Sequence, residues 1–212
     1  PFLLFAAAIG IAFNSLSLYE YGFDKYNVVS TTGLARTELV KSAETLISYF
    51  NSGEDYIELT VEKDGVEFEL FTREESIHMK DVKGLVRLDY GVLIGTLAYV
   101  LGYTGICLYK RKRGGLIARN LLIGSGVTLA LIMALWLGSL WNFDKLFHQF
   151  HLIAFSNDFW SAKGYMLKLF PGDFWYDATL FCVLGMAASA VVLGAAAASF
   201  LFFTKKGLHF HG

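Results

Sequence analysis

Four long apolar runs alternate with two polar segments along the chain. The runs cover residues 2–19, 90–109, 116–141 and about 178–203. About 20 consecutive apolar residues are needed to cross the hydrocarbon core of a bilayer as a helix. The pattern therefore predicts four transmembrane helices. The chain opens inside the first run without Met, so we expect a few residues to precede it, and we interpret this run as a retained helix rather than a cleaved signal peptide.

The first polar segment has the pattern of a small folded domain. Apolar residues recur at helical spacing between Leu39 and Phe50, which predicts a helix over about 34–50. The stretch YIELTVEKDGVEFELF then alternates apolar and polar residues on both sides of Asp64-Gly65. Because Asp-Gly supplies the positive φ angles of a tight turn, this stretch predicts a β-hairpin. A short helix over about 73–86 should lead into the second membrane helix.

Composition and charge agree with a membrane protein and give it an orientation. Apolar and aromatic residues make up 55% of the 212 residues and charged residues only 17%, whereas soluble domains carry about 25% charged residues. Of the 19 acidic residues, 15 lie in 17–90 and 4 in 141–177. The segments around Lys110–Arg113 and Lys205-Lys206 contain only basic charges. Because Lys and Arg mark the cytoplasmic side, both termini should be cytoplasmic and both acidic segments extracytoplasmic.

These patterns predict a mainly α membrane protein, a bundle of four transmembrane helices with a small α+β extracytoplasmic domain that contains a β-hairpin. The expected segments are transmembrane helix 1 (1–18), the extracytoplasmic domain (19–89), transmembrane helix 2 (90–109), a basic cytoplasmic loop (110–115), transmembrane helix 3 (116–141), an interfacial extracytoplasmic loop (142–177), transmembrane helix 4 (178–203) and a cytoplasmic tail (204–212). Nucleic-acid binding has no support, because the basic cluster is a short topology signal.

One candidate for chemistry is His78, in the first polar segment. On a helix, Asp81 lies three residues further on the same face, and Glu75 lies one turn before. A carboxylate there can fix the tautomer of the imidazole and leave the other nitrogen free as a base. The spacing alone favours the alternative, a solvated helix that happens to carry a histidine.

The second polar segment holds FHQFHLIAFSNDFW, residues 147–160. His148 and His151 are three residues apart on a predicted helix, and Asp144 precedes them on the same side. Aspartate and imidazole can bind zinc, so a metal site is one interpretation, although the spacing matches no familiar zinc motif. The aromatic residues favour an anchor in the headgroup layer. Asn157 and Asp158 either end the helix or orient a histidine.

Several catalytic signatures are absent from the sequence. It contains no G-x-S-x-G elbow, no Walker loop, no H-E-x-x-H and no C-x-x-C. Neither a serine nor a cysteine nucleophile is therefore indicated, and no cofactor is expected.

The combination of motifs resembles a known family. The chain has Glu75-x-x-His78-Met79-x-Asp81-Val82 after the predicted hairpin, and then His151-x-x-x-Phe155-x-Asn157-Asp158-x-Trp160. With four membrane helices, this pattern is similar to the bacterial integral membrane family of lipoprotein intramolecular transacylases, called Lit. The similarity covers nearly the whole chain, but departs after Trp160, where Ser161-Ala-Lys-Gly replaces the continuation expected for the family.

The resemblance implies an acyltransferase of the bacterial cell membrane. Such enzymes act on diacylglyceryl-modified lipoproteins, and move the sn-2 acyl chain onto the α-amine of the lipidated cysteine to give a lyso-form N-acyl lipoprotein. The family uses two histidines at the outer surface, which are His78 and His151 here. Glu75, Asp81, His148, Asn157 and Asp158 are the supporting residues that we expect, with Asp81 and Asp158 orienting the histidines.

Two other functions stay open on the sequence. One is a metal-dependent membrane hydrolase that uses Asp144, His148 and His151. The other is a non-enzymatic sensor or assembly protein whose outer domain binds a peptide or a lipid. For the transacylase, the expected partners are diacylglyceryl-modified lipoproteins and membrane lipids. The sequence does not say which histidine is the base and which is the acid.

Overall fold

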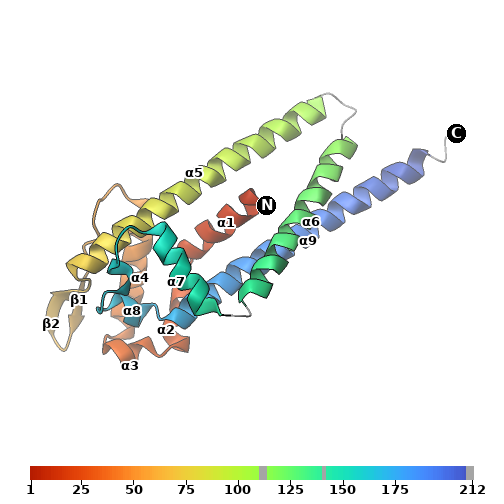
Figure 1. Cartoon of the computed structure of the whole chain (residues 1–212). Helices are drawn as coiled ribbons and strands as arrows, with labels where there is room; N and C mark the ends of the chain where they lie inside the picture. The colour runs from red at the N-terminus through yellow and green to blue at the C-terminus, as the bar shows by residue number, and fades with distance from the viewer. Residues whose placement is uncertain (110–113, 140–141, 209–212) are drawn as a thin grey trace. The chain divides into compact units, whose positions relative to one another are not determined.

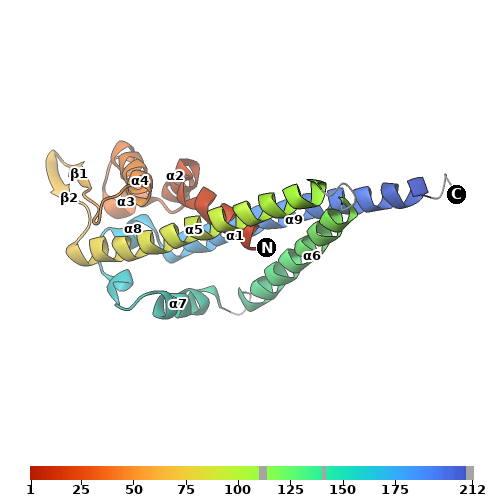
Figure 2. The same cartoon turned by 90° about the horizontal axis from the view of Figure 1, so that it is seen from above.

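A computed structural model describes residues 1–109, 114–139 and 142–208, which form two compact units. The helical unit comprises Pro1–Ile9, Tyr90–Trp141 and Phe181–Gly212, and the mixed unit comprises Gly10–Asp89 and Asn142–Leu180. Figures 1 and 2 label the elements in two views. Most of the predicted basic loop and the last residues of the predicted tail lie outside the described residues.

Helices dominate the secondary structure. The elements in chain order are α1 (Phe2–Phe13), α2 (Leu16–Lys25), α3 (Val28–Thr32), α4 (Arg36–Asn51), β1 (Thr60–Lys63), β2 (Val66–Glu69), α5 (Arg73–Tyr109), α6 (Gly114–Ser139), α7 (Phe143–Ala154), the 3-10 turn η1 (Phe159–Ser161), α8 (Met166–Leu169) and α9 (Gly172–Leu208).

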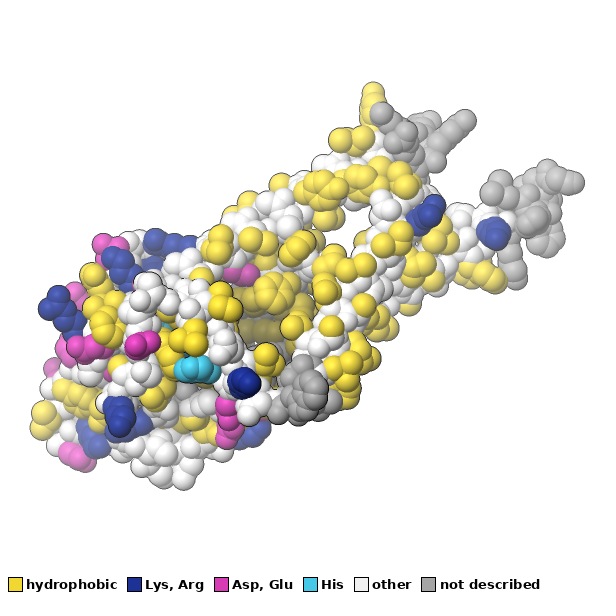
Figure 3. Space-filling view, in the orientation of Figure 1, with side chains coloured by type: hydrophobic (Ala, Val, Ile, Leu, Met, Phe, Trp, Pro, Cys, Tyr) yellow, Lys and Arg dark blue, Asp and Glu magenta, His cyan; other side chains and the backbone are white. Residues whose placement is uncertain are grey.

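The apolar helices carry the features of a membrane protein. Among the described residues, α5, α6 and α9 are long and apolar enough to cross a membrane, and the bent pair α1–α2 makes a fourth span if it is one unit. Figure 3 shows hydrophobic side chains along much of the surface of these helices. Within the helical unit, Asn120 Nδ2 donates to Tyr103 Oη at 2.6 Å. A Cβ on Gly194 would lie 3.2 Å from Ser125, so this glycine permits a close approach of α9 to α6.

The first predicted membrane helix is broken, which corrects the expectation of one helix to residue 18 or 19. Its helix α1 ends at Phe13, and α2 begins at Leu16 with a bend of 63° between them. Asn14 Nδ2 donates to the Gly10 carbonyl at 2.7 Å, and the Ser15 side chain accepts the Leu18 N–H as the cap of α2. Polar side chains that bond to the local backbone compete with a continuing helix.

Two other boundaries differ from the prediction. The short helix expected at 73–86 and the second membrane helix are one continuous helix, α5, because no residue between them breaks the helix. The last helix begins at Gly172 rather than near residue 178. Pro171 stands directly before it, where proline is well tolerated because the first N–H groups of a helix have no intrahelical partner.

The core of the mixed unit forms where α4 packs beside α2 and against β1. The apolar positions of α4 are buried as the helical spacing predicts, among them Leu39, Ala43 and Leu46. Strand β1 and the residues just before it complete this core through Ile57, Leu59 and Val61, which are all buried. Burial of an apolar side chain of this size stabilises a fold by about 1.5–3 kcal/mol. The isolated hairpin would be marginal without the helix.

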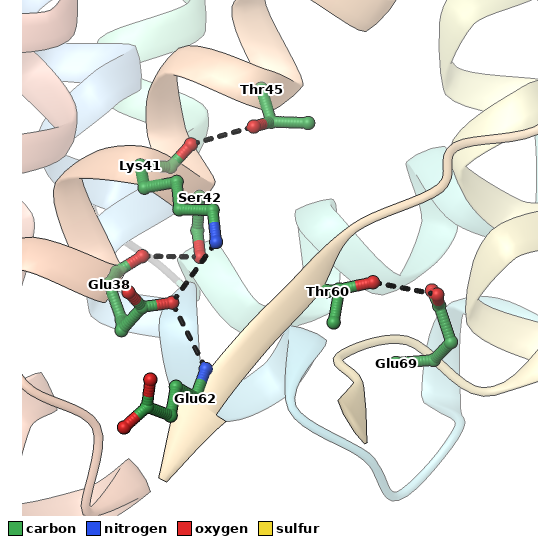
Figure 4. Close-up of polar contacts among 7 residues, drawn as sticks. All are labelled: Glu38, Lys41, Ser42, Thr45, Thr60, Glu62 and Glu69. Atoms are coloured by element: carbon green, nitrogen blue, oxygen red, sulfur yellow. Dashed lines mark hydrogen bonds and ion pairs between the residues drawn. The ribbon is translucent and has the colours of Figure 1, made fainter. Parts of the chain in front are cut away.

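The hairpin has its turn where the sequence predicts it, at Asp64-Gly65. Antiparallel β1 and β2 pair Lys63 with Val66, and the turn residues Asp64 and Gly65 have φ of 54° and 78°. Both central residues are left-handed, as a type I′ turn requires. Figure 4 shows how side chains fix the hairpin: Thr60 donates to Glu69 at 2.9 Å, and Glu38 of α4 accepts the Glu62 backbone N–H at 3.1 Å.

Candidate active site

A cavity in the mixed unit brings the two sequence motifs together. It has a volume of about 60 Å³, which is room for a few water-sized groups. Seven of its lining side chains are aromatic, namely Phe13, Tyr19, Phe50, Phe147, Trp160, Phe170 and Trp175. The lining contains His78 and His151 but no Asp, Glu, Lys or Arg. The site is therefore an apolar cavity with two imidazoles as its acid–base groups.

The two histidines face each other although 73 residues separate them. His78 lies in the second turn of α5, and His151 lies in the last turn of α7. Their ring centroids are 6.1 Å apart with an interplanar angle of 27°. Both are buried, with 5% and 6% of their surface exposed. Both rings line the same cavity, so one bound molecule can contact the two of them.

The backbone of α7 sets the tautomer of His151. Its Nδ1 lies 2.7 Å from the carbonyl oxygen of Phe147. Because a carbonyl only accepts hydrogen bonds, Nδ1 carries the proton, and Nε2 keeps a free lone pair when the ring is neutral. Burial lowers the pKa of His151 most strongly, the bond to Phe147 raises it, and the neighbouring His148 lowers it. The net pKa lies below its usual value, so the ring is neutral at pH 7.

His78 is held neutral even more firmly. Its pKa is lowered to about 4, first by burial and then by the neighbouring His151, while the charge of Asp81 acts in the opposite direction. The edge of its ring contacts Phe155, with centroids 4.8 Å apart. Its Nδ1 is buried and has no hydrogen-bond partner among the described residues. A buried polar atom without a partner marks a place where a bound molecule can supply one.

A hydrogen bond joins Asp81 to Asn157, and so connects the segments that carry the two histidines. Asn157 Nδ2 donates to Asp81 Oδ2 at 2.9 Å, and Asn157 Oδ1 accepts the Phe159 N–H at 3.1 Å. The predicted pairing of Asp81 with His78 is therefore indirect: the carboxylate acts on His78 through its charge, while its hydrogen bond goes to Asn157. The hydrogen bond between Asp81 and Asn157 therefore joins α5 to the segment that follows α7.

Glu75 is bound to the backbone. Its carboxylate accepts the Thr72 N–H at 2.9 Å, and Thr72 Oγ1 accepts the Glu75 N–H at 3.3 Å, which is a reciprocal capping box at the start of α5. The other oxygen accepts the Met166 N–H at 2.8 Å. Glu75 is fully buried, and a Cβ on Gly164 would collide with its carboxylate. Glu75 thus fixes the first turn of α5 and the start of α8, instead of orienting His78 directly.

His148 and Asp158 lie on the exposed side of this region. His148 is exposed and contacts the edge of Trp160, with centroids 5.2 Å apart. Asp158 is exposed, and its side chain makes no capping bond to η1. It is the Asp158 backbone carbonyl that accepts a bond, from Ser161 Oγ at 2.8 Å. Neither residue lines the cavity.

The structure does not bring the three candidate metal ligands Asp144, His148 and His151 together. His151 turns into the cavity and bonds to Phe147, whereas His148 and Asp144 are exposed. In the described parts of the chain, no three side chains of His, Cys, Asp or Glu are grouped so that they could hold a metal ion.

Three contributions to the site were missed by reasoning from the sequence. The Phe147 carbonyl fixes the His151 tautomer, and its signal is the i, i+4 spacing within α7. Trp160 was recognised only as part of the sequence motif. In the structure its ring packs beside His151, with ring centroids 4.8 Å apart. Gly164 had no signal, because its need for a small side chain depends on a carboxylate 89 residues earlier in the chain.

The fold is that of a mostly helical membrane-type protein, and it brings two buried histidines to one apolar cavity. The model of the family described as lipoprotein intramolecular transacylase Lit matches residues 1–175. The chain belongs to this family of acyltransferases.

Solved structures of the membrane integral lipoprotein intramolecular transacylase Lit from Bacillus cereus have the same fold. One has 23% sequence identity and a TM-score of 0.82, and covers 97% of this chain and 91% of its own. Two others are of variants of that protein in which a histidine is replaced, by Arg or by Ala. They have 24% identity and TM-scores of 0.77, with 97% of this chain and 88% or 89% of their own covered. A search of curated proteins found no significant match.

Proposed function

We propose that the chain moves the sn-2 acyl chain of a diacylglyceryl-modified lipoprotein onto the α-amine of its lipidated cysteine. The observation that carries this proposal is the facing pair His78 and His151 across an apolar cavity. Membership of the transacylase family supports it. The substrate brings its own nucleophile, so the absence of serine and cysteine motifs is what this chemistry requires.

In this mechanism His151 is the base. Its Nε2 lone pair takes a proton from the attacking amine as the N–C bond forms. The resulting imidazolium then protonates the glyceryl oxygen as the C–O ester bond breaks, so the proton count balances. General acid–base catalysis of this kind contributes about 10²–10⁴-fold. The bond to the Phe147 carbonyl stabilises the charged ring, which makes His151 the better base of the pair.

His78 then serves as a neutral hydrogen-bond donor. With a pKa of about 4, it stays uncharged at neutral pH. A neutral imidazole can donate from one nitrogen to the oxyanion of the tetrahedral intermediate. The apolar lining strengthens such a bond, because electrostatic interactions are stronger where water is excluded. The same lining disfavours an ammonium group, so the cavity favours the nucleophilic form of the amine.

The proposed location is the extracytoplasmic face of the bacterial membrane, with four spans and both termini cytoplasmic. The charge asymmetry supports this orientation, since Arg119 and Lys205 lie in segments without acidic residues. The diacylglyceryl group keeps its chains in the outer leaflet, with its ester near the headgroups. A cavity in the mixed unit, next in the chain to the membrane helices, suits an ester at that depth. Lipoproteins and membrane lipids are the proposed partners.

The deciding experiment uses single His78→Ala and His151→Ala variants in a bacterium that makes diacylglyceryl lipoproteins. Mass spectrometry of the lipoprotein N-terminal peptide should show N-acyl lyso product with the unaltered chain, and a loss of at least about 10²-fold with either variant. Gln149→Ala is the matched control, because Gln149 is an exposed polar residue of the same helix. Full product from either histidine variant at normal expression would reject the pair.

The same set of variants separates the two other functions. A metal-dependent hydrolase would release free fatty acid, and chelators would abolish its activity. A sensor or assembly protein would keep its function without the histidines and lose it through changes on the hairpin. Both outcomes differ from the loss of lyso product that we expect.

A further inference from the structure

The helix α7, which carries His151, has three distinct sides. One side faces the cavity region, where Phe147 is half-buried and His151 is buried. A polar side holds Asp144, Lys145, His148 and Gln149, which are all exposed. The third side, which we call the apolar flank, consists of Leu146, Phe150 and Ile153 at positions i, i+4 and i+7. This spacing places the three on one stripe of the helix, next to the cavity side.

The apolar flank is strongly exposed. Leu146, Phe150 and Ile153 expose 46%, 50% and 85% of their surface. Single exposed apolar residues are normal, but a continuous stripe beside a polar side is the pattern of a helix that lies in a membrane interface. Within the same segment, Phe150 of the flank also contacts the aromatic ring of Phe155, with ring centroids 6.1 Å apart. Aromatic rings are enriched at the headgroup level of bilayers.

The position of α7 in the chain identifies what covers the flank. Helix α6 is long and apolar enough to span a membrane, and α7 begins at Phe143, four residues after α6 ends at Ser139. Four residues extend over at most about 14 Å, so α7 starts close to the membrane surface where α6 leaves it. The flank is thus continuous in the chain with a surface that already meets lipid.

We propose that α7 is an interfacial helix whose apolar flank inserts into the headgroup–acyl boundary of the phospholipid bilayer. The polar side then faces water, and the cavity side carries His151 at the depth of a lipid ester. This inference rests on the membrane placement in the proposed function, but not on acyl transfer. Because the flank adjoins the cavity side, an acylated substrate can approach His151 laterally, without leaving the lipid.

Spin labels on two adjacent residues test the proposal. Ile153 belongs to the flank, whereas Leu152 follows His148 by four residues and therefore lies on the polar side. Leu152 is an exposed apolar residue as well, with 52% of its surface exposed, so it is a matched control. The full chain carries Cys107→Ala and Cys182→Ala, and then either I153C or L152C. It is reconstituted in vesicles of phosphatidylethanolamine and phosphatidylglycerol.

The measurement is the accessibility of each nitroxide to lipid-soluble oxygen and to a water-soluble nickel complex. We expect the ratio of oxygen to nickel accessibility to be severalfold higher at 153 than at 152. Equal water accessibility at both positions would overturn the proposal, and so would lipid exposure at both. Spin–spin broadening at 153 would identify a second copy of the chain as the occupant, and would overturn it too. None of these results depends on catalysis, so a failure here is distinct from a failure of the transacylase proposal.

Discussion

Asn157 and Asp81, which are 76 residues apart in the sequence, share a hydrogen bond of 2.9 Å between Asn157 Nδ2 and Asp81 Oδ2. Asp81 follows His78 by one turn of α5, and Asn157 follows His151 by six residues. The bond therefore connects the two segments that carry the histidines. Loss of this hydrogen bond should change the distance between the two imidazole rings while leaving the overall fold intact.

We expect Asn157→Ala and Asp81→Ala each to lower kcat for lyso-lipoprotein formation by about tenfold while reducing the stability by about 1 kcal/mol. The physical reason is that one hydrogen bond is lost and the histidine pair is less well positioned. The double variant should be little worse than either single one, as a double-mutant cycle would measure. Additive losses would mean that the two residues act separately. Ser156→Ala, at an exposed position next to Asn157, serves as the control.

Gly164→Ala should destabilise the protein by about 2 kcal/mol. Its Cβ would collide with the buried carboxylate of Glu75, which is held by the Thr72 and Met166 N–H groups and cannot move away freely. Thermal unfolding in detergent would show a lower Tm. Gly84→Ala in α5 is the control, because nothing lies within 4 Å of its Cβ position and alanine favours a helix. A Tm unchanged by Gly164→Ala would contradict the packing described for Glu75.

The buried His78 should make stability depend on pH. Its pKa falls from 6.5 to about 4 on folding, so the unfolded chain binds more protons between these values. Stability should therefore decrease as the pH falls from about 6.5 to 4, by up to roughly 3 kcal/mol. In His78→Phe this part of the pH dependence should disappear. Chemical unfolding at a series of pH values measures it, and equal slopes for both proteins would show that His78 is not buried in its neutral form.

Catalytic activity should decrease on acidification at a lower pH than it would with a histidine of ordinary pKa. Burial lowers the pKa of His151 and outweighs the opposing bond to Phe147, so the base stays neutral as the pH decreases through 6.5. Activity should persist there and decline only at lower pH. The pH profile of kcat/KM reports this value for the free enzyme. Imidazole NMR should also find the proton of His151 on Nδ1, and a proton on Nε2 would contradict the proposed role as base.

The hairpin turn should contribute to stability and not to chemistry. Gly65 has φ of 78°, and a residue with a Cβ pays about 1–2 kcal/mol in this region. Gly65→Ala should lower the Tm while the purified folded enzyme keeps its turnover. Gly53→Ala, at a glycine with ordinary φ and open space around it, is the control. A loss of function in the folded Gly65 variant would instead favour the sensor or assembly hypothesis.

Local patterns were enough to predict much of this architecture. The alternation around Asp64-Gly65 predicted the hairpin, and the spacing of Leu39 to Phe50 predicted α4, because side-chain periodicity and turn chemistry act over a few residues. Apolar length likewise predicted the three long apolar helices α5, α6 and α9. The break at Asn14-Ser15 was missed, since hydropathy does not register polar side chains that bond to their own backbone.

The sequence by itself determined the hairpin, α4, the long apolar helices and the presence of two histidine motifs, because each of these depends on local spacing. Only the tertiary structure decided that His78 and His151 meet, that Asp81 bonds to Asn157, and that Glu75 binds backbone rather than an imidazole. These relationships join residues more than 70 positions apart. Long-range packing sets both their distance and the exclusion of water that lowers the pKa of each histidine, and no local pattern in the chain contains that information.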